Sequence, residues 1–136
     1  MQTELLLPKS DSKADKRKRN RQRESNRTAV AIQVRKTDGR CMNFRCPMVR
    51  YRDLAFIAAH HIERRRPHEP ALDSPENMIT LCKRCHKAAH EGGEDHHNKR
   101  LTAKQFMIYV LEFHVGTERW RWEEQYQRLK RMEPAT

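Results

Sequence analysis

Apolar residues are unevenly distributed along the 136-residue chain, and their spacing changes from one segment to the next. Residues 1–27 have almost no apolar periodicity, so we expect them to form a disordered arm. Residues 28–34 alternate between polar and apolar side chains, with Val30, Ile32 and Val34 on one face, which predicts a strand. The first quarter of the chain is therefore predicted to be an unpacked arm that leads into a short strand.

Two shorter patterns follow in the middle of the chain. Residues 56–62 end an apolar stretch and are suited to a strand, in which neighbouring side chains point to opposite faces. Residues 83–91 are typical of a short helix, which Gly92 and Gly93 should stop. A strand and a helix of this length predict a small α+β domain.

Two amphipathic helices are predicted for the C-terminal part. The first begins at Thr102 and ends near Gly116, with a stripe of residues at core spacing, namely Phe106, Tyr109, Val110 and Phe113. Thr117 is an N-cap candidate for the second, whose stripe comprises Trp122, Tyr126, Leu129 and Met132. We interpret both stripes as packing surfaces.

The composition limits the core and points to an acidic partner. A mean hydropathy of -1.08 implies a small core, while a net charge of +11 and a pI near 10.0 favour a polyanion, above all nucleic acid. A basic protein that is merely soluble, or that touches ribosomes or anionic membrane, is the alternative. No apolar run approaches the length of a membrane span, and we expect a cytoplasmic protein with reduced thiols and no membrane partner.

Two clusters of basic residues are candidates for phosphate contacts. The first lies in the N-terminal arm and contains Lys16, Arg17, Lys18 and Arg19. It could follow a phosphate backbone, or it could be a solvated tail without a specific partner. The second cluster begins three residues after a histidine pair and consists of Arg64, Arg65 and Arg66.

The four cysteines form two pairs with the spacing of zinc ligands. Four residues separate Cys41 from Cys46, and two residues separate Cys82 from Cys85. Four thiolates complete a tetrahedral zinc site and leave no open position, so this site should be structural. In the alternative, His86 replaces one of the cysteines in a mixed site.

The histidines outside that cysteine set offer a second, open metal site. His60, His86 and His90 could bind one divalent ion through three nitrogen atoms, since His86 and His90 lie one turn apart on the predicted helix. His61 should point away from His60 and could act as a general base, because imidazole has a reference pKa of about 6.5.

These residues together resemble the HNH endonucleases, whose motif contains a paired histidine, an asparagine and then Cys-x-x-Cys-His. The matching residues are Ala59-His60-His61-Ile62, Asn77 and Leu81-Cys82-Lys83-Arg84-Cys85-His86. The resemblance implies that His61 activates the attacking water, that His60 and His86 hold the catalytic ion, and that Asn77 fixes the loop that orients His61. His90 matches the branch formed by the nuclease colicins, in which the last histidine is a third ligand.

The resemblance also implies a fold and an activity. The fold is a zinc-stapled ββα-metal domain, similar to a treble clef, at residues 28–100, between the basic arm at 1–27 and a helical extension at 101–136. The activity is metal-dependent hydrolysis of phosphodiester bonds in DNA, most naturally double-stranded, by nicking or double-strand cleavage. The cofactors would be structural Zn²⁺ and a catalytic Mn²⁺, Ni²⁺, Co²⁺, Zn²⁺ or Mg²⁺.

Two further expectations concern function and assembly. In the alternative to an enzyme, a zinc-stapled module binds nucleic acid without cutting it. Small free-standing HNH proteins are common in phages, so a phage-like protein that works within larger phage or restriction machinery is one expectation. A homodimer is another, because a dimer would most easily make two nearby nicks on opposite strands.

Overall fold

The computed structural model describes residues 12–46, 57–64, 66 and 69–132. Its elements are, in chain order, α1 (Lys13–Asp38), β1 (Ile57–His61), the 3-10 turns η2 (Pro70–Leu72) and η3 (Pro75–Asn77), β2 (Met78–Cys82), α2 (Lys83–Glu91), β3 (Gly93–Glu94), β4 (Arg100–Leu101), α3 (Ala103–Glu112) and α4 (Glu123–Met132). Helices combined with two small sheets and a cluster of four cysteines confirm the predicted α+β class. Within the described part of the chain, no helix is both long and apolar enough to cross a membrane.

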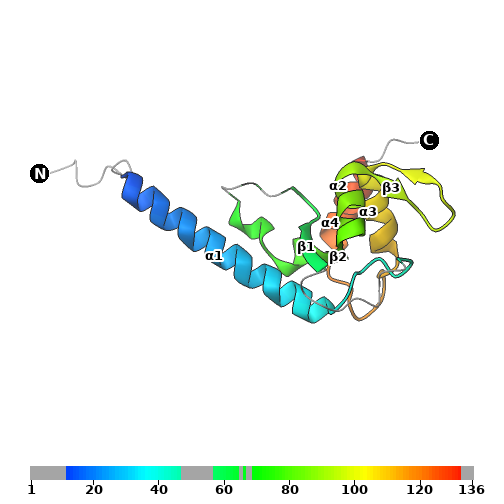
Figure 1. Ribbon diagram of the computed structural model, residues 1–136, viewed down its shortest axis with the longest axis horizontal. Coiled ribbons are helices and arrows are strands. Elements are labelled where there is room, and N and C mark those ends of the chain that lie inside the picture. The colour runs from blue at the N-terminus through cyan, green and yellow to red at the C-terminus, as the bar shows by residue number, and fades with distance from the viewer. Residues whose placement is uncertain (1–11, 47–56, 65, 67–68, 133–136) are drawn as a thin grey trace, which may run out of the picture.

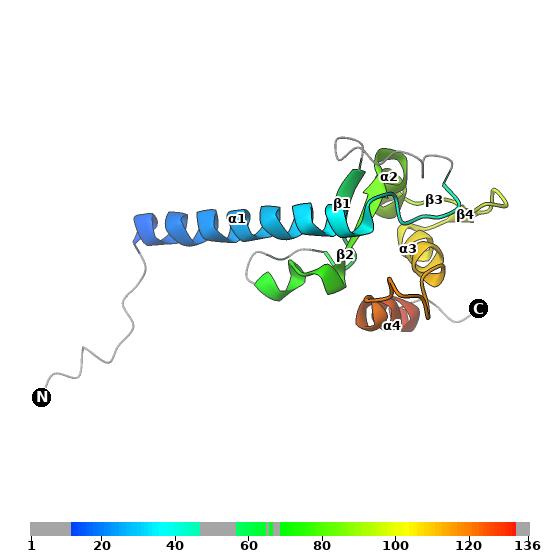
Figure 2. The same ribbon diagram turned by 90° about the horizontal axis from the view of Figure 1, so that it is seen from below.

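An antiparallel pair of strands, β1 and β2, forms the centre of the fold and leads directly into α2 (Figure 2). The register joins Ile57 to Cys82 and His61 to Met78. The strand predicted at residues 56–62 is thereby confirmed at 57–61, while residue 56 lies outside the described ranges. This ββα arrangement brings the histidines of β1 next to α2.

The helix predicted at residues 83–91 is confirmed with the same limits. Its N-cap is Cys82, whose sulfur accepts a hydrogen bond from the helix backbone. It ends at Gly92, whose φ of 93° lies in the left-handed region. A side chain there would also clash, because a Cβ would lie 2.7 Å from the Leu101 carbonyl oxygen. The glycine therefore fixes the length of the helix that carries His86 and His90.

Helix α1 differs most from the prediction. The disordered arm expected for residues 1–27 and the strand expected at 28–34 are both replaced by one helix from residue 13 to residue 38. The predicted boundary between residues 27 and 28 thus lies inside a continuous element. Residues 1–11 lie outside the described part.

Local signals explain why this segment is helical. Ser12 caps its first turn, and Gly39, with a φ of 72°, ends it by donating its N–H to the Arg35 carbonyl. No glycine or proline interrupts the segment. The apolar alternation was misleading because Val30 and Val34 are also four residues apart, which is helical spacing. The C-terminal end of α1 packs on β1 and β2, whereas its N-terminal half projects from the body of the molecule (Figures 1 and 2).

The C-terminal extension packs onto this centre, as its two predicted packing stripes imply. Helix α3 begins after Thr102 as predicted, with a capping box between Thr102 and Gln105, and it buries Phe106 and Val110. A second helix from Thr117 is wrong, since α4 begins at residue 123. The expected helical register from Thr117 is lost because residues 119–122 have other partners.

These partners lie at the end of α1 and on β2. The Trp122 indole is fully buried and donates to the Met78 carbonyl at 2.9 Å. Arg121 forms two hydrogen bonds with the carboxylate of Asp38, at 2.8 and 3.0 Å, and the backbone N–H of Thr80 donates to the same carboxylate at 3.1 Å. We call this group, Asp38 with Thr80 and Arg121, the Asp38 junction. It joins α1, β2 and the C-terminal extension.

Candidate active site

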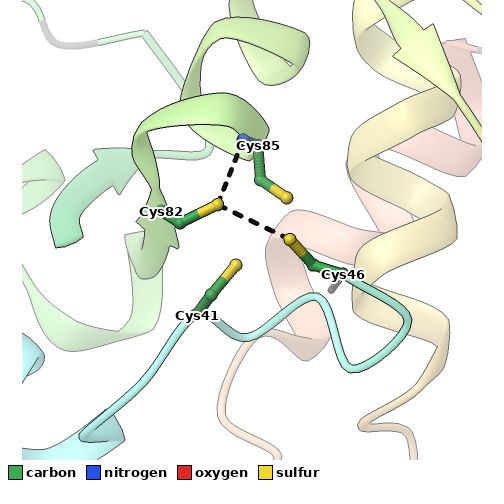
Figure 3. A group of neighbouring side chains, drawn as sticks. All are labelled: Cys41, Cys46, Cys82 and Cys85. Carbon is green, nitrogen blue, oxygen red and sulfur yellow. Dashed lines mark hydrogen bonds between the residues drawn. The ribbon is translucent and has the colours of Figure 1, made fainter. Parts of the chain in front are cut away.

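The four cysteines converge between the loop after α1 and the start of α2 (Figure 3). Their sulfur atoms all lie within 4.8 Å of one another, and those of Cys46 and Cys82 are 3.6 Å apart. Two N–H groups are directed at sulfur, the Asn43 amide at Cys85 and the Cys85 backbone at Cys82, each at 3.4 Å. All four cysteines are buried.

This group has the donor chemistry of a structural zinc site. Zinc–sulfur bonds of about 2.3 Å in a tetrahedron would place sulfur atoms about 3.8 Å apart, close to the observed separation. The Cys41 and Cys46 thiols lower the pKa of Cys82 through hydrogen bonds, whereas hydrogen bonding to its neighbours and burial raise the pKa of Cys85. The Cys82 thiolate is thus stabilised by its neighbours, whereas a bound cation would favour ionisation of Cys85. The four-cysteine set fits Zn²⁺ and leaves no position for a reactant.

Three histidines form a second group of candidate metal ligands, separate from the four cysteines. His60 comes from β1, and His86 and His90 come from α2, where they are four residues apart. Their candidate ligand atoms also lie within 4.8 Å of one another, and the Nε2 atoms of His86 and His90 are 3.1 Å apart. Metal–nitrogen bonds of about 2.1 Å at angles of 90° to 109° would require about 3.0 to 3.4 Å. His86 therefore groups with the other histidines and not with the cysteines.

The surroundings keep two of these imidazoles neutral. Burial, followed by the nearby His86 and His90, lowers the pKa of His60 to about 3. Burial, followed by the effect of His90, also lowers the pKa of His86. A metal ligand must be a neutral imidazole, so the site is arranged for a cation without a prior loss of protons. The three nitrogens fit a divalent ion.

His61 lies beside His60 in sequence but has a different partner. Its Nε2 atom is 2.8 Å from a carboxylate oxygen of Asp73, and the two side chains are only 17% and 9% exposed. When Nε2 carries the hydrogen that Asp73 accepts, Nδ1 holds the lone pair that can accept a proton. The two adjacent histidines of β1 therefore have different partners, although both line the pocket described below.

Asp73 was not among the residues predicted for the site. It lies twelve residues after His61, in the loop that contains η2, and by sequence it was only a loop residue beside prolines. Its contact depends on how that loop folds back over β1, which no local pattern encodes. The one available signal was an acidic residue shortly before Asn77.

Asn77 holds the same loop. It is 1% exposed, its side-chain oxygen accepts from the Glu63 N–H at 2.7 Å, and its amide donates to the carbonyls of Glu63 and Leu72 at 3.1 and 2.9 Å. Its own carbonyl accepts from Ile62 at 2.8 Å. Asn77 thus ties the residues after His61 to the segment that ends in Asp73.

The predicted phosphate-binding arginines have different positions. Arg64 is exposed and lines the pocket described below. Arg66 is paired with Glu63 and Glu69 at 2.9 and 2.8 Å. Arg65 lies outside the described residues. Of this cluster, Arg64 is the residue whose described position suits a ligand in the pocket.

A pocket of about 750 Å³ is lined both by the three candidate metal ligands and by His61. Its lining includes His60, His61, His86, His90 and Arg64, and also four residues of α1, namely Arg27, Thr28, Ala31 and Arg35. These positions were missed because the sequence predicted a disordered arm up to residue 27 and a strand at residues 28–34, not one continuous helix. Lys16, Arg17, Lys18 and Arg19 lie further along the same helix and are all exposed.

Comparison with known proteins supports the resemblance seen in the sequence. Residues 47–92 match the family model of the HNH endonucleases, a nuclease-type family. The match covers about a third of the chain and includes β1, β2 and α2, with the histidines, Asn77, Cys82 and Cys85. The searches of curated proteins and of solved structures found no match. The predicted HNH resemblance is confirmed for this region.

Proposed function

We propose that the protein is a metal-dependent endonuclease that hydrolyses phosphodiester bonds in double-stranded DNA. One observation carries the proposal: three imidazoles converge in an arginine-lined pocket beside a histidine that is paired with a largely buried carboxylate. The three imidazoles have the chemistry of an open metal site, and the histidine paired with the carboxylate has the chemistry of a general base.

His61 is the proposed base. With its Nε2–H donated to Asp73, it accepts a proton from water through Nδ1. The water oxygen then bonds to phosphorus, the bond between phosphorus and the 3′-oxygen breaks, and the 3′-oxygen takes a proton from solvent. The Asp73 carboxylate fixes the tautomer and the ring orientation of His61, and it stabilises the positive charge that His61 gains. Asn77 maintains the loop geometry that this pair needs.

His60, His86 and His90 are the proposed ligands of the catalytic ion. A divalent ion held there would supply Lewis-acid stabilisation of the charge that develops on the scissile phosphate. Nitrogen donors favour Zn²⁺, Ni²⁺, Co²⁺ or Mn²⁺ over Mg²⁺, which prefers oxygen.

The remaining parts of the site have supporting roles. Arg64 is the proposed contact to the scissile phosphate, since it lines the same pocket as His61. Zinc bound to the four cysteines would staple the loop after α1 to the start of α2 and so hold β2 and α2 in place.

The test is a nicking assay on supercoiled plasmid. Wild-type protein, with zinc retained and the histidine site loaded in turn with Mn²⁺, Ni²⁺, Co²⁺, Zn²⁺ or Mg²⁺, should convert the plasmid to open-circular or linear DNA. The His61→Ala variant should bind the same amount of metal and DNA but cleave at least about a hundredfold more slowly. If no metal supports cleavage while DNA is still bound, the protein is a nucleic-acid-binding module instead. If His61→Ala cleaves normally, His61 is not the base.

A further inference from the structure

We propose that α1 is a duplex-binding element, and that only the face of α1 that lines the histidine pocket contacts the DNA backbone. This inference rests on the function proposed above, since it assumes that the scissile phosphate occupies that pocket. It adds a surface, a direction for the bound duplex and a division within the basic cluster of α1.

The pocket defines the relevant face. Arg27, Ala31 and Arg35 line it and are spaced four residues apart, so they lie along one side of the helix. We call this side the pocket face of α1. Arg27 forms an ion pair with Glu24, one turn further from the pocket. The helix therefore brings basic groups to the pocket and continues past it.

Helical geometry separates the basic residues beyond the pocket into two sets. At 100° per residue, Lys16 lies about 60° from Ala31 around the helix axis and Arg17 about 40° from it. Lys18 and Arg19 lie about 140° and 120° away, on the opposite side. Four consecutive basic residues thus contain a pair on the pocket face and a pair directed away from it.

The distance from the pocket fits a duplex. Arg17 precedes Arg27 by ten residues, which corresponds to about 15 Å along the helix. Phosphates on one strand of DNA rise about 3.4 Å per base pair, so this distance spans about four to five base pairs. DNA is stiff over such a length, so a duplex whose phosphate lies in the pocket would stay within reach of the projecting half of α1 (Figure 2).

The charge of the projecting half identifies the kind of partner. Residues 13–23 include seven lysines and arginines and one acidic residue, Asp15. Like charges recur at helical contact spacing, for example Lys13 with Arg17 and Arg17 with Arg21, and such pairs destabilise an isolated helix. A phosphate backbone relieves this repulsion. An apolar protein partner would find no apolar stripe in this segment.

The experiment compares two double variants with equal changes in charge and similar helix propensity, Lys16→Gln/Arg17→Gln and Lys18→Gln/Arg19→Gln. Binding to a 20-base-pair duplex is measured by fluorescence anisotropy between 50 and 300 mM salt, in zinc-loaded protein that carries His61→Ala. Loss of two phosphate contacts should make the negative slope of log K, where K is the association constant, against log salt shallower by about 1.8. It should also weaken binding at 100 mM salt by about tenfold to sixtyfold. We expect this for the pocket-face pair. The opposite pair should change Kd by less than about twofold, because screening shortens its reach.

Either of two results would overturn the inference: equal weakening by both pairs, which would indicate a response to net charge alone, or no weakening by the pocket-face pair. Circular dichroism checks that both variants keep α1 helical. The binding assay does not depend on cleavage. A protein that nicks plasmid but treats both pairs alike therefore retains the proposed function and loses the pocket-face inference, whereas one that never nicks plasmid loses the proposed function.

Discussion

Replacing Asp73 with Asn tests the proposed pairing of His61 with a carboxylate. The change removes one negative charge and keeps the size and shape of the side chain. The Nε2 to Oδ1 distance is 2.8 Å and both side chains are largely buried, so solvent screens the interaction little. A hydrogen bond to a charged group contributes about 1.5 to 3 kcal/mol. If His61 gains a proton in the transition state, losing this contribution should lower kcat by about 10- to 150-fold.

The assay is single-turnover cleavage of a labelled duplex at saturating protein. DNA affinity, metal content and the melting temperature should stay close to those of wild type, because Asn keeps the size and shape of the Asp73 side chain and its Oδ1 acceptor. In a His61→Ala background, Asp73→Asn should have no further effect. Wild-type kcat for the single variant, or an undiminished effect of Asp73→Asn without His61, would refute the reasoning.

Three further outcomes are expected. Cys82→Ser should abolish zinc binding and cooperative unfolding, as judged by elemental analysis and thermal melting, and a variant that keeps both would contradict a structural site. Asp38→Ala should lower the free energy of unfolding by about 3 to 5 kcal/mol in urea titrations, because it leaves the Arg121 charge half buried without its partner. Because the pKa of His60 is lowered to about 3 in the folded state, protonation favours the unfolded chain. With the histidine site metal-free, stability should therefore be intact above about pH 6.5 and decline toward pH 3, more steeply in wild type than in His60→Gln.

Short-range patterns were enough to predict the centre of the protein. Gly92 marks the end of α2, and the four-residue spacing of His86 and His90 sets their common face. The alternation of a strand separates His60 from His61. Each of these relations depends on neighbouring residues and on the fixed geometry of one element, so a single sequence contains them.

The features that were missed depend on contacts between distant segments. Val30 and Val34 fit a strand and a helix equally well, and only the full capped segment decides between them. Asp73 reaches His61 through the fold of a loop. The start of α4 moves because Arg121 and Trp122 bind groups elsewhere in the fold. Local propensity carries no record of such contacts.

The Asp38 junction has a consequence for the order in which the protein matures on the ribosome. Its two charged members are 83 positions apart in the sequence, and the carboxylate is almost inaccessible to water. Until Arg121 emerges from the exit tunnel, burial of Asp38 lacks its cationic partner and is unfavourable. The candidate metal ligands, the last of which is His90, are therefore all synthesised before α1 can pack stably beside the pocket. Full assembly of the histidine pocket is thereby postponed until Arg121 has left the exit tunnel.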